Sequence, residues 1–171
     1  RTDIERGERE GRIAAHEIGP ALGSSQVLIL IPPGEDAETI DPDWRRAADG
    51  LVARCESPVH LALVRRFDGR DGARLAARAA LAEAWGLDTV AITDALYHAP
   101  ERRALQDVVT CIREHVRIDE AGRRLQANAE RHLKPPEEMA RLFPEHAGAV
   151  ARTAVLARRI TFSLDALVYE Y

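Results

Sequence analysis

The sequence predicts an α/β protein whose strands run parallel, and three observations support this. Residues 27–31, 59–64 and 89–92 are short, mainly apolar runs, the first two of them apolar on both faces, which favours buried strands. Amphipathic stretches separate the runs, with helix signals such as Pro42 near the start and Gly86 at the end. Alternating strands and helices imply crossover connections, so the sheet is either open or an arc of a barrel.

The elements up to residue 92 follow in this order. The first strand ends at the breakers 32–34, and the next helix has Asp41 as its cap and ends near Cys55. After the second strand, residues 67–72 are rich in glycine and aspartate but match no phosphate-loop motif, so we interpret them as a turn. The helix before the third strand has apolar side chains at helical spacing: Leu75, Ala79, Ala82 and Trp85.

After residue 98 the pattern is helical only. Pro100 opens a strongly amphipathic helix, Pro136 opens another with acidic residues in its first turn, and Pro144 precedes a last one. The apolar face of the first of these helices is formed by Leu105, Val108, Val109 and Ile112.

Composition indicates an ordinary globular protein, because 46% of the 171 residues are hydrophobic and 30% are charged. A net charge of -4 gives no overall sign of nucleic-acid binding, and no apolar run is long enough to span a membrane. Cys55 and Cys111 lie far apart and read as reduced thiols, so we expect a cytoplasmic protein. The chain lacks an initiator Met and ends on an apolar stretch, so we also expect a fragment.

Several blocks in the second half carry a resemblance to a known family. Residues 90–113 read VAITDALYHAPERRALQDVVTCIR, and 128–134 read NAERHLK. Shorter blocks lie at 118–122, 138–143 and 162–165. Together they resemble bacterial C-family DNA polymerases, those related to the replicative polymerase III alpha subunit. The Leu-Tyr-His and Asn-Ala-Glu-Arg-His-Leu-Lys versions resemble the error-prone branch.

This resemblance covers residues 88–171, whereas residues 1–87 match only in the order of strands and helices. It implies that residues 1–98 are the C-terminal part of a polymerase-and-histidinol-phosphatase (PHP) domain, a partial (βα) barrel with parallel strands. Residues 99–171 would then be an all-helical segment that connects to the polymerase palm. The family's magnesium-binding palm aspartates would lie beyond Tyr171.

The resemblance also implies a function for the full polypeptide: DNA-directed DNA synthesis with magnesium, across damaged DNA. DNA and deoxynucleotides would be partners through the parent, together with replication or repair accessory proteins, and no membrane. The segment itself would act as a scaffold. We expect it to be inactive alone and to hold no catalytic residue, cofactor-binding residue or cofactor.

Asp94 lies just past the third strand, at the sheet edge where active sites of parallel sheets gather. In metal-binding PHP domains this position resembles the Asp of an Asp-x-His pair, whose side chains point the same way and reach one metal. Here Leu96 replaces the histidine, and His98 lies two residues farther on. We therefore interpret Asp94 and His98 as a degenerate metal site, in which Asp94 forms a turn and His98 packs against the next helix.

On the second strand, Ala62 and Arg66 stand where metal-binding relatives have Glu and His. One alternative function is nevertheless a PHP-type metal-dependent phosphoesterase or 3'-5' exonuclease, and another is a non-catalytic interaction or DNA-binding module. Basic side chains suited to phosphate are numerous, but interspersed acids favour a salt-bridged surface. The basic residues are Arg102, Arg103, Arg123, Arg124, Arg131, His132 and Lys134.

Overall fold

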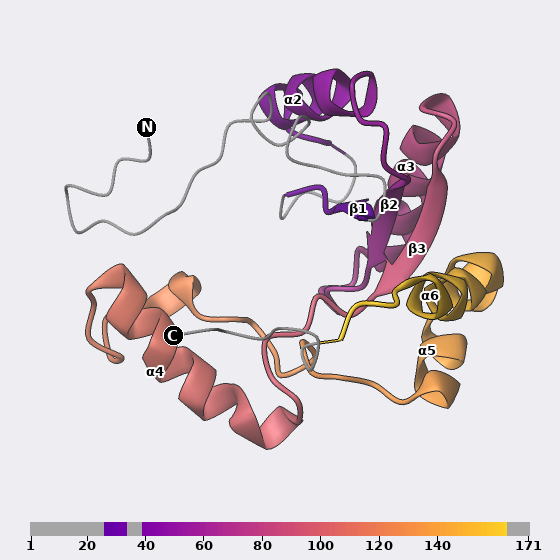
Figure 1. The fold of residues 1–171 in the computed structure, drawn as a ribbon. Helices are drawn as coiled ribbons and strands as arrows, with labels where there is room; N and C mark the ends of the chain where they lie inside the picture. The colour runs from indigo at the N-terminus through magenta and orange to yellow at the C-terminus, as the bar shows by residue number, and fades with distance from the viewer. Residues whose placement is uncertain (1–25, 34–38, 164–171) are drawn as a thin grey trace, which may run out of the picture.

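The computed structural model describes residues 26–33 and 39–163, and these contain a three-stranded parallel sheet in the order β1-β2-β3 (Figure 1). Two helices make the crossovers between the strands. The predicted α/β class and parallel sheet are therefore confirmed, with the third strand beginning one residue earlier than expected. The elements are β1 (Leu28–Leu30), α2 (Pro42–Val52), β2 (Val59–Val64), α3 (Asp71–Ala84) and β3 (Asp88–Ile92).

The start of α2 shows how the local sequence specifies a helix. The Asp41 side chain accepts hydrogen bonds from the backbone N–H groups of Asp43 at 2.8 Å and Trp44 at 2.9 Å. Pro42 occupies the first turn, where its missing N–H costs nothing. The predicted cap at Asp41 is therefore confirmed.

Two clusters of buried side chains form the core. One joins β1 and β2 to α2 and α3, around Leu30 and Leu61. The other joins Leu63 and Ala91 of the sheet to α3, Phe143 and α6. The expectation of burial on both faces is met by β2 but is wrong for β1, an edge strand among the described residues, whose Ile29 is 37% exposed.

The part after residue 98 contains only helices within the described residues, as predicted, apart from one isolated bridge between Tyr97 and His132. The last helix returns to the sheet, where Arg152 pairs with Asp88 at 2.8 Å and donates to the carbonyl of Thr89.

The domain boundary at 98–99 stays a prediction, and the block at 162–165 is described only to Ser163. The helices are η1 (Pro100–Arg102), α4 (Arg103–Glu114), η2 (Gly122–Arg124), α5 (Pro136–Leu142), η3 (Pro144–His146) and α6 (Ala147–Arg159).

The helix α4 lies apart from the sheet (Figure 1). Its apolar face, predicted from the sequence, is exposed, and Ile112 near its C-terminal end is 68% exposed. A pocket of about 490 Å³ lies at the C-terminal end of this face, between Ile112 and Ile118, with the buried Cys111 in its wall. None of the described helices is long and apolar enough to cross a membrane.

Candidate functional site

The carboxyl ends of the three parallel strands lie side by side at one end of the sheet, called the carboxyl edge below. The segments that leave these strand ends form the candidate site. Pro32 follows β1, Arg66 follows β2 and Asp94 follows β3. Residues 128–134, far along the chain, return to this edge: Leu96 donates its N–H to the carbonyl of Arg131 at 2.9 Å. The edge is therefore built from four separate segments.

Asp94 is held by two arginines. Its Oδ2 lies 2.7 Å from Nη2 of Arg131 and 3.3 Å from Nη1 of Arg66. The Nε of Arg131 also donates to the Asp94 carbonyl at 2.8 Å. The backbone of Asp94 is left-handed, with φ of 50°, a conformation that Asp adopts more readily than most residues.

Burial and then the neighbouring Arg131 lower the pKa of the Arg66 guanidinium, while Asp94 acts in the opposite direction. The single half-buried carboxylate of Asp94 thus neutralises the guanidinium groups of both Arg66 and Arg131.

Asp94 and His98, the two predicted metal residues, share no hydrogen bond or ion pair within the described residues, and His98 is exposed. Their interpretation as a degenerate metal site stays a prediction. Across residues 26–33 and 39–163, no group of three or more His, Cys, Asp or Glu side chains is placed to hold a metal ion. The ion-pair partners of Asp94 are guanidinium groups, which are not ligands for zinc or manganese.

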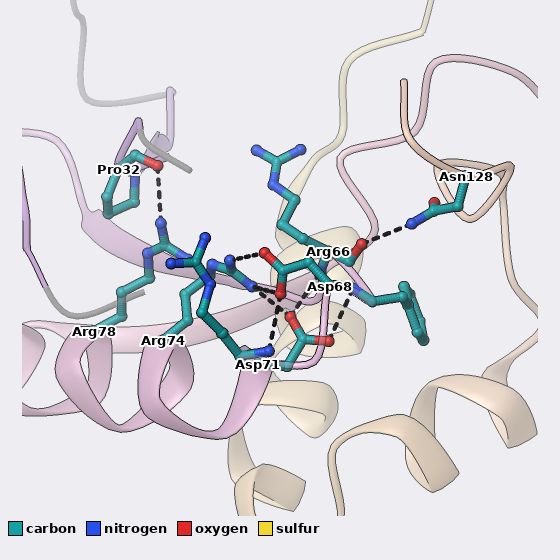
Figure 2. Close-up of polar contacts among 9 residues, drawn as sticks. Pro32, Arg66, Asp68, Asp71, Arg74, Arg78 and Asn128 are labelled. Atoms are coloured by element: carbon teal, nitrogen blue, oxygen red, sulfur yellow. Dashed lines mark hydrogen bonds and ion pairs between the residues drawn. The ribbon is translucent and has the colours of Figure 1, made fainter. Parts of the chain in front are cut away.

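The turn after β2 is organised by Asp71 (Figure 2). Its carboxylate accepts the N–H groups of Arg66 at 2.8 Å and Phe67 at 3.0 Å, and Nη1 of Arg74 lies 2.6 Å away. Arg74 is fully buried and also binds Asp68 through both terminal nitrogens. This hydrogen bond with Arg74 lowers the pKa of Asp68 to about 2. The predicted turn is confirmed for residues 67–70, whereas Asp71 and Gly72 already belong to α3.

Arg78 lies deeper in the same edge, where its Nη2 donates to the Pro32 carbonyl at 3.3 Å (Figure 2). Burial, followed by repulsion from Arg74 and Arg66, lowers its pKa to about 10. Burial above all, with the neighbouring positive charges adding to it, thus disfavours the charged form of this guanidinium.

The block at 128–134 is tied to the edge by its own side chains. Asn128 donates to the Arg66 carbonyl at 2.8 Å, which joins two segments 62 residues apart (Figure 2). Lys134 is almost fully buried and pairs with Glu130 at 2.8 Å and Glu138 at 3.6 Å. The ring of His132 lies 2.9 Å from the Ala129 carbonyl.

A cleft of about 860 Å³ opens between the residues that follow β2 and those that follow α4. Eight of its fifteen lining residues are arginines, and its two carboxylates, Asp68 and Glu130, are already paired with Arg74 and Lys134. The cleft is therefore strongly positive. Its arginines are Arg65, Arg66, Arg70, Arg74, Arg103, Arg123, Arg124 and Arg131.

The sequence interpretation of a salt-bridged surface is right for Arg103 and Lys134, which pair with Asp107 and Glu130. It misses Arg123 and Arg124, which are exposed and form no ion pair within the described part of the chain. The sequence signal that could have indicated these two residues is a pair of adjacent arginines directly after Gly122. The cleft itself was not visible in the sequence, because its walls come from segments about sixty residues apart.

No family model matches the chain. Among curated proteins, the chain is 48% identical over 152 residues to the error-prone DNA polymerase of Rhodopseudomonas palustris (strain HaA2), which is 88% of this chain and 13% of that protein. It is 43% identical over 144 residues to the error-prone DNA polymerase of Brucella abortus, covering 84% of this chain and 13% of the relative. The corresponding protein of Caulobacter vibrioides is 44% identical over 146 residues, 85% of this chain and 13% of its own length.

These matches identify the chain as homologous to one segment of DNA polymerases. The polymerases in question are the error-prone DNA polymerases, so the resemblance found in the sequence is confirmed. The chain spans only about one eighth of the length of these relatives.

Proposed function

We propose that this chain is part of a longer error-prone DNA polymerase, which carries out DNA-directed DNA synthesis with magnesium and copies damaged templates in the cytoplasm. The observation that carries the proposal is 48% identity over 152 residues to a protein of that name. DNA and deoxynucleotides would be its substrates, and repair or replication proteins its partners. The magnesium-binding carboxylates would belong to a part of the polypeptide outside this chain.

Primer extension by the full-length protein tests this function. We expect extension of a primed template that depends on added magnesium, and continued extension past an abasic site in the template. A full-length protein that extends no primer with any divalent ion would contradict the proposal.

Within that polymerase we propose that the chain is an inactive scaffold, the C-terminal part of a PHP domain with its helical connection. The supporting geometry is the parallel β-α-β-α-β order and the state of Asp94. In place of a metal, Asp94 contacts two guanidinium groups, one of which belongs to Arg66. By the resemblance, Arg66 stands where metal-binding relatives have a histidine. A positive side chain there replaces the charge of a cation without supplying a ligand.

Metal analysis of the full-length protein tests the scaffold proposal against a metal-dependent phosphoesterase. We expect the protein to bind no stoichiometric zinc or manganese at Asp94. We also expect any exonuclease activity that a chelator abolishes to persist unchanged in Asp94→Asn. Tight metal binding by calorimetry that disappears in Asp94→Asn would show a working metal site and overturn the proposal.

A further inference from the structure

The arginine-lined cleft concentrates positive charge in a chain whose net charge is -4. Arg66 and Arg131 share the single carboxylate of Asp94, and each carboxylate of the lining is already paired. Arg123 and Arg124, on η2 at the cleft, have no ion pair within the described residues. The cleft therefore has a surplus of guanidinium groups that its own acids do not neutralise.

The arginines of the inner wall are held in place before any ligand arrives. Arg131 binds both the carboxylate and the carbonyl of Asp94, while the fully buried Arg74 is held between Asp68 and Asp71 and supports the wall without facing solvent. A guanidinium group fixed as that of Arg131 is binds phosphate oxygens at a smaller entropic cost than a free side chain does. Arg123 and Arg124 are exposed, so they are accessible to a ligand entering from solvent.

We propose that this cleft binds the sugar–phosphate backbone of a DNA strand. The inference rests on the proposed polymerase function, which makes DNA the polyanion at hand. A volume of about 860 Å³ is far larger than a single phosphate requires and suits several consecutive groups of a strand. The lining contains no aromatic side chain for base stacking, so the contacts would read the backbone and not the sequence.

The lining chemistry favours a DNA strand over a nucleoside triphosphate. A triphosphate binds with magnesium, and magnesium needs carboxylate or water ligands. The two carboxylates of the cleft, Asp68 and Glu130, are engaged by Arg74 and Lys134. The strand backbone needs only guanidinium and amide donors, which the cleft supplies.

The test measures DNA binding by the full-length polymerase through fluorescence anisotropy, with labelled single strands and primed templates, over about 50 to 200 mM salt. The variant Arg123→Ala/Arg124→Ala should weaken binding several-fold. It should also reduce the slope of log affinity against log salt by about 1 to 2, since each lost phosphate contact removes about 0.7 to 0.9. The charge-preserving Arg123→Lys/Arg124→Lys should keep most of that slope.

The matched control is Arg158→Ala/Arg159→Ala, an adjacent exposed pair at the end of α6 that does not line the cleft. It changes the net charge equally and should leave affinity and slope unchanged. Equal losses in both variants, or no loss in Arg123→Ala/Arg124→Ala, would overturn the inference. If wild type extends primers normally while these results appear, the inference fails and the proposed function stands.

Discussion

Asp94 joins two segments at the carboxyl edge of the sheet, because its carboxylate neutralises both Arg66 and Arg131. We expect Asp94→Asn to destabilise this edge by about 1–3 kcal/mol, since two guanidinium groups then face each other half-buried. Asn tolerates the left-handed backbone at this position, so the substitution tests charge and not strain. Hydrogen exchange of the amides of Leu96 and Leu133, which join the two segments, measures the loss.

Asp119→Asn is the control for this prediction. Asp119 pairs with Arg117 at 3.1 Å on the surface, where both side chains are mostly exposed. Such a pair contributes less than about 1 kcal/mol. Equal effects of the two substitutions would show that the Asp94 cluster is also an ordinary surface pair.

His60 gives the β2 strand a dependence on pH. It is buried, neither ring nitrogen has a hydrogen-bond partner of good geometry in the described chain, and burial lowers its pKa, with Asp88 only partly opposing. The unfolded chain therefore binds a proton near the ordinary pKa of about 6.5, while the folded chain does so only at lower pH. The stability that comes from keeping His60 neutral is therefore fully present above the unfolded-state pKa of about 6.5. It is lost as the pH falls from there toward the lower pKa of the folded state.

We expect His60→Leu to reduce the loss of protection of β2 amides between about pH 7 and pH 5, measured by hydrogen exchange corrected for intrinsic rates. At neutral pH the substitution should be neutral or stabilising, because it removes an unpaired buried polar group. His98→Leu, which removes an exposed ring, serves as control. An unchanged pH profile in His60→Leu would contradict this account.

At the scale of elements, the start of α3 depends on Asp71, whose carboxylate binds two backbone N–H groups of the preceding turn and the buried Arg74. We expect Asp71→Ala to destabilise α3 and this turn by about 2–4 kcal/mol, because it leaves buried donors unsatisfied. Exchange of the α3 amides in the full-length protein measures the effect. Asp43→Ala removes an exposed acidic residue from the first turn of α2 and should cost less than about 1 kcal/mol; a comparable cost would contradict the role assigned to Asp71.

The elements that the sequence predicted well are those specified by local signals. Asp41 and Pro42 define the start of α2, and the apolar run of β2 defines a strand buried on both faces. The pattern of β1 was equally apolar, yet its burial depends on what covers the sheet edge, and no local signal reports that. The same holds for α4, whose amphipathic pattern was right but whose apolar face is exposed.

The candidate site was predictable only in part for a related reason. The position of Asp94 after a parallel strand was visible in the sequence. Its partners were not, because Arg131 lies 37 residues farther along the chain and is brought back by pairing between residues 96–97 and 131–133. Where the sequence showed interspersed acids and bases, the fold sorted a group of arginines to one cleft.

At the scale of the whole molecule, the exposed apolar face of α4 concerns what surrounds this chain. The chain spans about one eighth of the length of its relatives, so most of such a polypeptide lies outside it. Burying an isoleucine contributes about 1.5–3 kcal/mol, which gives the rest of the polypeptide a reason to cover this face. We therefore expect α4 to dock on another part of the same full-length polymerase.

Ile112→Glu in the full-length protein tests this docking. The substitution should weaken docking by at least about 2 kcal/mol and speed hydrogen exchange throughout α4, because it places a charge in an apolar interface. Arg113→Glu, on a neighbouring exposed residue of the same helix, should leave exchange nearly unchanged. If Ile112→Glu is as harmless as Arg113→Glu, the face is free in the whole polymerase as well, and its partner must be sought outside the polypeptide.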